Sequence, residues 1–297
     1  MRDDPAPQKS RIRLGYSIEL AYEALGRVDF IFMVHAARTS QQHVLQESVT
    51  LTPNVPYRVD VDGASGNRLL RTRVQGGELR VRYAATVEVA HHMADPARLV
   101  AVPLVELPAP TLRFLLPSRY CQVDKVQQFA WSEFGNVAPG HAQVKAVIED
   151  VRARTRFQVG VSTVDTSAVE TLREGVGVCR DFAHLAIALL RALNYPARFV
   201  TAVDYGADPR LGPPDFHAYV ETFLGGRWYL FDPTGISPTT GLIRIATGRD
   251  AADVSFATMF GPVRSGMPRV AFAAAEDVSA GIMRPAPTSL AVSTALM

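Results

Sequence analysis

A cysteine, a histidine and an aspartate in the second half of the chain have the types and the order that nucleophilic attack on a carbonyl group needs. Cys179 follows two glycines and precedes a run whose apolar residues repeat with helical spacing, so we expect it at the first turn of a buried helix. Unpaired backbone N–H groups and the helix dipole favour an anion there, and a thiolate is one. The alternative is a small buried cysteine that packs like alanine.

The histidine and the aspartate come from two neighbouring strands of a predicted hairpin. Strand alternation puts His217, Tyr219 and Glu221 on one face. Gly225-Gly226 predicts a two-residue turn between two antiparallel strands. The numbers of two residues that lie opposite each other then sum to 451, which is 225 + 226. Tyr219 then lies opposite Asp232. His217 is the diagonal neighbour of Asp232 on the same face, close enough for the two side chains to meet. A bulge in the hairpin would break this register.

Together the three residues would make a thiol-based nucleophilic site. The Cys179 thiolate would attack a carbonyl carbon, and His217 would take the thiol proton and later give it to the leaving group. Asp232 would hold the imidazole in one tautomer. Backbone N–H groups at the helix start are candidates for an oxyanion hole. The alternatives are that His217 is a structural sheet histidine and that Asp232, which precedes a proline, only begins a turn.

Three motifs around these residues carry a family resemblance. They are Gly-Val-Cys-Arg-Asp-Phe-Ala at 177–183, Phe-His-Ala-Tyr-Val-Glu at 216–221 and Trp-Tyr-Leu-Phe-Asp-Pro-Thr at 228–234. The chain from about Pro117 to Gly261 resembles the transglutaminase-like superfamily, in particular its bacterial cysteine protease branch. Members of that branch join an N-terminal β-domain to a papain-like transglutaminase core, and the first part of this chain resembles that β-domain.

The resemblance implies a function and a role for each site residue. The family nucleophile falls on Cys179, its base on His217 and its acid on Asp232. It implies a cysteine-dependent acyl-transfer enzyme that acts on amide bonds of a protein or peptide, as a peptidase, amidase or transamidase, through a thioester on Cys179. Because the family includes inactive members, the alternative is a catalytically silent peptide-binding or scaffold protein. Tyr120 is a candidate for the side chain that completes the oxyanion hole.

Other polar residues near the site are expected to have structural roles. His184 lies on a different side of the helix from Cys179. Arg180 and Asp181 either form an ion pair in the first turn or contact the site, and Asp181 suits the helix dipole. Cys121 is interpreted as an ordinary buried thiol. The Cys/His/Asp set offers neither a complete zinc ligand set nor a close chelating pair, so we expect no metal and no cofactor.

The composition is typical of a globular protein, with 297 residues, 47% hydrophobic and 20% charged, and a net charge of +2. No basic stripe predicts a nucleic-acid partner. The first residues lack the apolar core of a secretion signal, and no apolar run approaches the roughly 20 residues that span a bilayer. Two cysteines favour reduced thiols, so we expect a cytoplasmic protein without a membrane partner. The oligomeric state is left open.

The fold class that these patterns predict is α+β. Short strands between Arg11 and Leu107 predict an N-terminal antiparallel β-sandwich, and Gly76-Gly77 predicts a hairpin within it. The neighbouring residues His91 and His92 could form a metal pair, but adjacent strand residues face opposite ways, so we do not expect both to chelate one ion and interpret them as solvated loop histidines. We assign residues 1–108 to the β-sandwich, with a polar lead-in over 1–10, residues 109–280 to a papain-like transglutaminase core and residues 281–297 to a loosely ordered tail.

The core is expected to contain helices that are followed by an antiparallel sheet, because its helices precede its strands rather than alternating with them. The predicted helices are Val123–Phe134, Gln143–Thr155, a short one capped by Ser167 and Glu170, and the helix that begins near Cys179. The predicted strands are Ala197–Tyr205, Phe216–Leu224 and Arg227–Phe231, with a last strand at Arg269–Phe272 and an irregular polar segment at Gly248–Val254.

Overall fold

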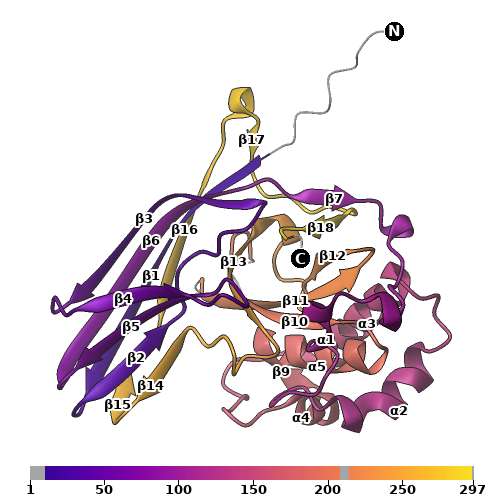
Figure 1. Ribbon diagram of the computed structural model, residues 1–297, viewed down its shortest axis with the longest axis horizontal. Coiled ribbons are helices and arrows are strands. Elements are labelled where there is room, and N and C mark those ends of the chain that lie inside the picture. The colour runs from indigo at the N-terminus through magenta and orange to yellow at the C-terminus, as the bar shows by residue number, and fades with distance from the viewer. Residues whose placement is uncertain (1–10, 208–213, 296–297) are drawn as a thin grey trace.

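The computed structural model describes residues 11–207 and 214–295. Residues 1–10, which the sequence predicts as a polar lead-in, lie outside this part. The protein is a mixed α/β molecule in which two N-terminal sheets lie on one side and the helices gather around a third sheet on the other side (Figure 1).

The N-terminal sheets are built around one long strand. Strand β1 pairs antiparallel with β6 along nearly its whole length, and β3 continues that sheet on the other side of β6. The side chains of β1 are alternately buried and more exposed, which places Leu14, Tyr16 and Ile18 in the core. The strands of this region are β1 (Arg11–Ala24), β2 (Val28–Phe32), β3 (Gln42–Thr52), β4 (Tyr57–Val61), β5 (Arg68–Val74) and β6 (Gly77–Val89).

The predicted hairpin at Gly76-Gly77 is wrong. Strand β5 pairs with β2 and β4, whereas β6 pairs with β1 and β3, so the two strands belong to different sheets. Both glycines have positive φ, 146° and 87°, and they turn the chain from one sheet into the other. Strand β6 instead forms a long non-local ladder with β1, from Ile12 opposite Val89 to Ala24 opposite Gly77.

Several strands that follow the core return to the N-terminal sheets. We assigned residues 109–280 to the core, but β14 pairs with β2, and β15 and β16 pair with β1. The predicted last strand is therefore an added strand of the N-terminal sheet, and it is not the last one. The bounds are β14 (Ala257–Phe260), β15 (Val263–Ser265), β16 (Arg269–Ala275) and β17 (Ile282–Met283).

The segment assigned to a loosely ordered tail is packed where the structure describes it. Strand β17 pairs in parallel with β1, and β18 (Ala291–Ser293) pairs with β7 (His92–Ala94). The side chain of Val292 is 1% exposed. Residues 281–295 therefore close the molecule, while residues 296–297 lie outside the described part.

The core sheet has four antiparallel strands in the order β12-β11-β10-β13. Its strands are β10 (Ala197–Asp204), β11 (Phe216–Leu224), β12 (Arg227–Phe231) and β13 (Leu242–Gly248). The predicted bounds of β11 and β12 are confirmed, and β10 ends one residue earlier than predicted. Gly225 and Gly226 both have positive φ, 53° and 88°, as a two-residue type I′ turn requires.

The helices precede this sheet in the chain, as predicted. Val123–Phe134 is confirmed as α2, and Glu170 accepts a hydrogen bond from the Ser167 backbone N–H at 3.0 Å, which caps α4. The helical elements are α1 (Ala109–Leu112), α2 (Val123–Phe134), α3 (His141–Arg154), α4 (Ala168–Glu174) and α5 (Cys179–Ala192). The short strands β8 (Arg156–Phe157) and β9 (Val176–Gly177) pair in parallel beside them.

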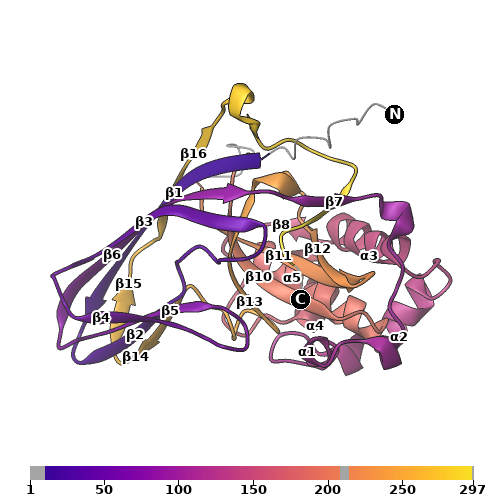
Figure 2. The same cartoon turned by 45° about the horizontal axis from the view of Figure 1, so that its top comes forward.

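Helix α5 is the centre of the core. It packs on β10 and β11 and is covered by α2, α3 and α4 (Figure 2). Every residue from Asp181 to Ala192 is buried, so the helix is enclosed on all sides rather than on the single face that its periodicity predicted. Arg191 is buried within it and donates to the carbonyl oxygens of Ala197 and Leu116 at 3.0 and 2.9 Å.

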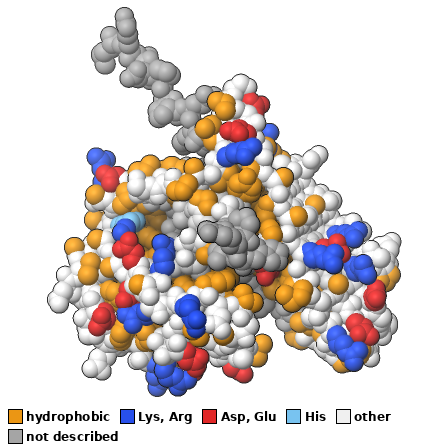
Figure 3. Space-filling model, turned by 180° about the vertical axis from the view of Figure 1, so that it is seen from behind, with side chains coloured by type: hydrophobic (Ala, Val, Ile, Leu, Met, Phe, Trp, Pro, Cys, Tyr) orange, Lys and Arg blue, Asp and Glu red, His pale blue; other side chains and the backbone are white. Residues whose placement is uncertain are grey.

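On the surface, basic and acidic side chains are interspersed over the N-terminal sheets on the face shown in Figure 3. The strands of these sheets carry ion pairs, such as Arg82 with Glu19 at 3.0 Å and Arg264 with Glu23 at 3.1 Å. Among residues 11–207 and 214–295, no helix has the length and apolarity that crossing a bilayer requires.

Candidate active site

Cys179 occupies the first position of α5, as the sequence predicts. Gly175 ends α4 with a left-handed φ of 65°, and the chain then passes through β9 to Val178, the extended residue that precedes the helix. Cys179 is partly exposed, although the helix beyond it is buried. Its Sγ lies 4.0 Å from the carbonyl oxygen of Phe216, the residue before His217. The helix start therefore brings the thiol to the end of β11.

Asp181 holds the turn that carries Cys179. Its fully buried carboxylate accepts a hydrogen bond from the Val178 backbone N–H at 2.9 Å and another from the hydroxyl of Ser162. Arg180 forms an ion pair with it at 3.2 Å. A Cβ atom on Gly177 would lie 2.7 Å from the Asp181 Cβ, so only glycine fits there. Arg180 and Asp181 therefore form the ion pair of the first turn, at a helix end that favours the carboxylate.

His217 and Asp232 meet through the hairpin register. Val220 pairs with Phe231 and Leu224 pairs with Arg227, so the sum of 451 is confirmed and the hairpin has no bulge. His217 Nε2 lies 3.3 Å from Asp232 Oδ2, and each side chain is 2% exposed. The ring N–H is not aligned with that oxygen closely enough for a hydrogen bond. The pair is thus a buried ion-pair contact.

Asp232 is held from both sides of its turn. Its Oδ1 accepts hydrogen bonds from the backbone N–H of Thr234 at 2.9 Å and from the Thr234 hydroxyl at 2.7 Å. Arg152 of α3 donates to the Asp232 carbonyl oxygen at 2.8 Å. The carboxylate therefore presents its other oxygen to His217 in a fixed position.

The electrostatics of the pair favour its charged form. Burial alone would lower the pKa of His217, but the Asp232 carboxylate and the neighbouring Cys179 sulfur outweigh burial and hold that pKa well above its ordinary value. Burial would likewise raise the pKa of Asp232, but His217 and the Thr234 hydrogen bonds hold it below its ordinary value. Both directions agree on an imidazolium facing a carboxylate.

Cys179 and His217 open into one cleft of about 440 Å³. Aromatic side chains form much of its wall: the rings of Phe216 and Phe256 stack with their centroids 4.3 Å apart. Phe199 and Tyr120 also line the cleft, and Arg180 is a cationic residue of its lining. An acyl group with an apolar neighbour would therefore fit beside the sulfur.

Two comparisons place these residues in a family. Residues 114–233 match the family model of the transglutaminase-like superfamily, and residues 13–110 match that of the bacterial transglutaminase N-terminal domain. A solved structure described as a "putative cysteine protease" from Cytophaga hutchinsonii is 36% identical, with a TM-score of 0.89 over 95% of this chain and 97% of that one. The chain belongs to the transglutaminase-like superfamily.

Curated relatives of this transglutaminase-like chain come from mycobacteria. An uncharacterized protein of Mycobacterium leprae is 27% identical over 258 residues, which is 82% of this chain and 91% of the relative. An uncharacterized protein of Mycobacterium tuberculosis is 30% identical over 142 residues, which is 44% of this chain and 45% of the relative. The shared region of the first relative thus spans both matched parts.

Tyr120 does not offer its hydroxyl proton to the cleft of this transglutaminase-like core. The hydroxyl donates to the Val164 carbonyl oxygen at 2.8 Å, and the ring stacks on His184 with centroids 4.8 Å apart. The buried carboxylate of Asp250 accepts a hydrogen bond from the Tyr120 backbone N–H at 2.9 Å. His184 accepts one from the Ala251 backbone N–H at 3.2 Å. The polar segment after β13 therefore has a structural role in fixing one wall of the cleft.

The remaining sequence candidates lie away from the site. Cys121 is fully buried and burial raises its pKa to about 12, so its interpretation as a buried thiol is confirmed. The expectation that His91 is solvated is wrong, because its side chain is buried and 7% exposed. Burial lowers the pKa of His91 to about 4. No group of three or more metal-ligating side chains occurs in the described part of the chain.

Sequence reasoning missed the residues that support the site from a distance. Ser162 and Arg152 come from other elements and reach the site only through tertiary packing. Thr234 had a local signal, because Asp-Pro-Thr is a typical turn in which the aspartate accepts from the residue two positions later.

Proposed function

We propose that the protein is a cysteine-dependent acyl-transfer enzyme that acts on amide bonds through a thioester on Cys179. The observation that carries the proposal is the buried pair of His217 and Asp232, 3.3 Å apart, beside a partly exposed cysteine at a helix N-terminus. A structural histidine would gain little from a buried carboxylate that is itself fixed by Thr234. A base that must become an imidazolium next to a thiolate needs such a partner.

Each residue has one role in the proposed reaction. The Cys179 thiolate attacks the amide carbonyl carbon, and the C–N bond breaks as His217 gives its proton to the leaving amine. This leaves an acyl group on sulfur. Water or a second amine then attacks the thioester, His217 takes the proton of that nucleophile, and the C–S bond breaks to release the Cys179 thiolate, which restores the starting pair of thiolate and imidazolium. Asp232 keeps the imidazole oriented throughout.

The start of α5 supports stabilisation of the developing oxyanion. The backbone N–H of Val178 is bonded to Asp181, and those of Asp181 and Phe182 are bonded to the Val178 carbonyl oxygen. Within the described residues, the N–H groups of Cys179 and Arg180 have no hydrogen-bond acceptor. They therefore remain available to an oxygen atom in the cleft. Such donors contribute about 3 kcal/mol each in related chemistry.

The cleft and the family support a substrate class for the proposed enzyme. Its aromatic wall suits a protein or peptide segment with an apolar side chain next to the reactive carbonyl. The similar structure described as a "putative cysteine protease" supports amide bonds as the target. The two free thiols support a reducing, cytoplasmic setting, which we include in the proposal.

The finer description of the fold is also part of the proposal. Packing of α5 against β10 and β11 supports a papain-like core. Contacts of Tyr22 on β1 with Phe30 and Phe32 on β2, at 5.2 and 5.7 Å between centroids, support a sandwich of the two N-terminal sheets.

An activated ester tests the chemistry without knowledge of the natural substrate. We expect p-nitrophenyl acetate to give a burst of p-nitrophenolate equal to the protein concentration, with the acetyl group on Cys179 by mass spectrometry. Cys179→Ala should abolish the burst, and His217→Ala should slow both acylation and release. Added butylamine would distinguish the two outcomes, because transamidation gives N-butylacetamide and hydrolysis gives acetate. Acetylation no faster than that of N-acetylcysteine at the same pH would instead identify a silent scaffold.

A further inference from the structure

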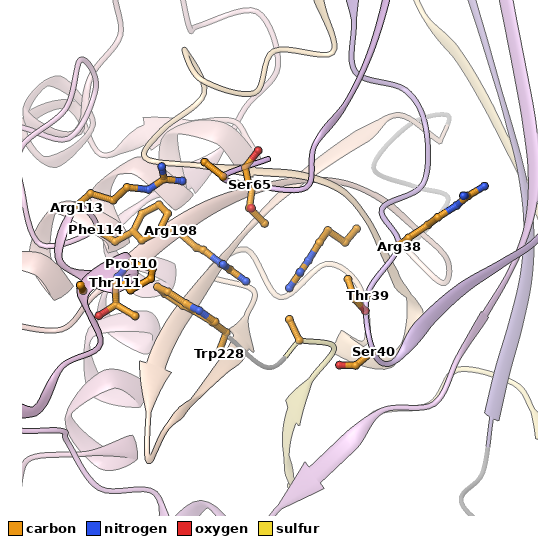
Figure 4. A pocket seen from close by; sticks show the side chains of 15 residues that line it. Arg38, Thr39, Ser40, Ser65, Pro110, Thr111, Arg113, Phe114, Arg198 and Trp228 are labelled. Carbon is orange, nitrogen blue, oxygen red and sulfur yellow. The ribbon is translucent and has the colours of Figure 1, made fainter. Parts of the chain in front are cut away.

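A second cavity, of about 690 Å³, lies where the N-terminal part meets the core sheet (Figure 4). Its core side is formed by Arg198 of β10, Trp228 of β12 and Arg244 of β13. Arg198 alternates with Ala197 and Phe199, which belong to the core cluster around α5, so its side chain leaves the opposite face of the sheet. Loops from the N-terminal part and α1 close the cavity, which we call the junction pocket.

The charge of the junction pocket is of one sign. Arginines line it at positions 38, 113, 198 and 244, and none of its lining residues is acidic. Figure 4 shows Arg198 directed into the pocket beside the ring of Trp228, whereas Arg38 is directed away. Arg38 pairs with Glu47 at 2.9 Å, so it contributes little to the interior. Arg113 lies at the rim, with its guanidinium over the ring of Phe114 at 4.8 Å.

The two deep arginines share one carboxylate. Glu221 is fully buried beneath the pocket and pairs with Arg198 at 2.6 Å and with Arg244 on its other oxygen. Two guanidinium groups against one carboxylate leave one buried positive charge in excess. The side chains of Arg198 and Arg244 are only 12% and 7% exposed. A buried charge without a counter-charge is unfavourable unless a ligand or solvent supplies one.

A donor atom without a hydrogen-bond partner lies beside this excess positive charge. Arg244 Nε is buried and has no hydrogen-bond partner within the described residues. Burial lowers the pKa of Arg198 to about 10 even though Glu221 opposes the shift. Arginine side chains that line a cavity with excess positive charge are typical of sites for oxyanions.

We propose that the junction pocket binds a small-molecule oxyanion, a phosphate- or carboxylate-bearing metabolite, on Arg198 and Arg244 with Arg113 at the entrance. The volume suits a small organic anion rather than a bare ion alone. Glu221, beneath the pocket, is four residues along β11 from His217 and lies on the same face of that strand. At the rise of a strand the two residues are about 13 Å apart. The junction pocket is thus separate from Cys179, and binding needs no acyl transfer.

Fluorescence gives a direct test, because the chain has two tryptophans, Trp131 and Trp228. In a Trp131→Phe chain, Trp228 is the only reporter and it lines the pocket. Titration with inorganic phosphate, and separately with citrate, should give a saturable change in its emission and a rise in Tm. Saturation by phosphate alone, citrate alone or both supports the site and distinguishes the two sources of the anion.

Matched variants decide whether the signal comes from the pocket. Arg244→Lys keeps a charge beside Glu221 but loses Nε, and Arg113→Gln changes only the exposed rim. Each should weaken binding by about tenfold, while Arg264→Gln on the distant strand β15 should not. If Arg244→Lys fails to fold, Arg113→Gln decides. A response that sodium chloride reproduces at equal ionic strength, or that Arg113→Gln leaves unchanged, overturns the proposal.

Discussion

His217 and Asp232 stand 3.3 Å apart inside the protein, each with 2% of its side chain exposed, while the cysteine that they would serve remains partly open to the cleft. Burial strengthens the interaction of the two charges and excludes water that would compete for the imidazole. The missing alignment of the ring N–H is ordinary for a free enzyme, because such contacts tighten when substrate binds. The relation makes the aspartate the most informative residue to change.

Asp232→Asn should lower the rate of p-nitrophenolate release by about 10²–10⁴-fold, because a neutral amide cannot stabilise the imidazolium. Since Asp232 holds the pKa of His217 well above its ordinary value, its loss should move the His217-linked step of the rate to lower pH. The pH profile of Cys179 alkylation measures this shift. Thr234→Val, which removes one hydrogen bond to Oδ1, is the milder control. An unchanged profile in Asp232→Asn would contradict the ion pair.

The two cysteines should differ in reactivity by at least about 100-fold toward iodoacetamide at neutral pH. Cys179 is partly exposed beside His217, whereas Cys121 is fully buried with a pKa raised to about 12. Peptide mass mapping after timed alkylation gives both rates in one sample. In denaturant the rates should converge, since burial is then lost. Faster alkylation of Cys121 in the folded protein would show that the packing around it is wrong.

Local signals explain how much of the site could be predicted. A two-residue glycine turn sets the pairing of its own hairpin, so the register that brings His217 to Asp232 followed from numbering alone. Helical periodicity likewise gave α2 and the start of α5. Both inferences rest on interactions within a few residues along the chain.

Long-range pairing explains what could not be predicted. Strands β14 to β16 join β1 and β2 across more than 200 residues, which no local pattern indicates. Gly76-Gly77 has the same dipeptide as the hairpin at Gly225-Gly226 but turns between two sheets. One partner of each buried charge is also distant in sequence, Ser162 for Asp181 and Leu116 for Arg191, so these contacts are visible only in the fold.

Gly177→Ala should impair the site although it touches neither His217 nor the sulfur. The new Cβ would lie 2.7 Å from the Asp181 Cβ and 3.0 Å from its Oδ2, so the carboxylate that holds Val178 must move. We expect a loss of about 1–3 kcal/mol in the free energy of unfolding and slower alkylation of Cys179. Urea unfolding and alkylation rates measure the two effects. Gly63→Ala, where no atom lies within 4 Å, should change neither.

Acid should destabilise the protein partly through His91. Its pKa is about 4 in the folded state and 6.5 for the ordinary side chain, so the unfolded chain binds more protons between these values and stability falls as pH drops from 6.5 toward 4. At pH 5 this amounts to about 2 kcal/mol. His91→Phe should therefore reduce the loss of unfolding free energy between pH 7 and pH 5, which urea titration measures. The variant breaks no hydrogen bond of Nε2, because that atom has no partner in the described residues. His43→Gln, at an exposed position of β3, should leave that loss unchanged. An equal loss in His91→Phe and in the unaltered chain would show that His91 is not kept neutral by burial.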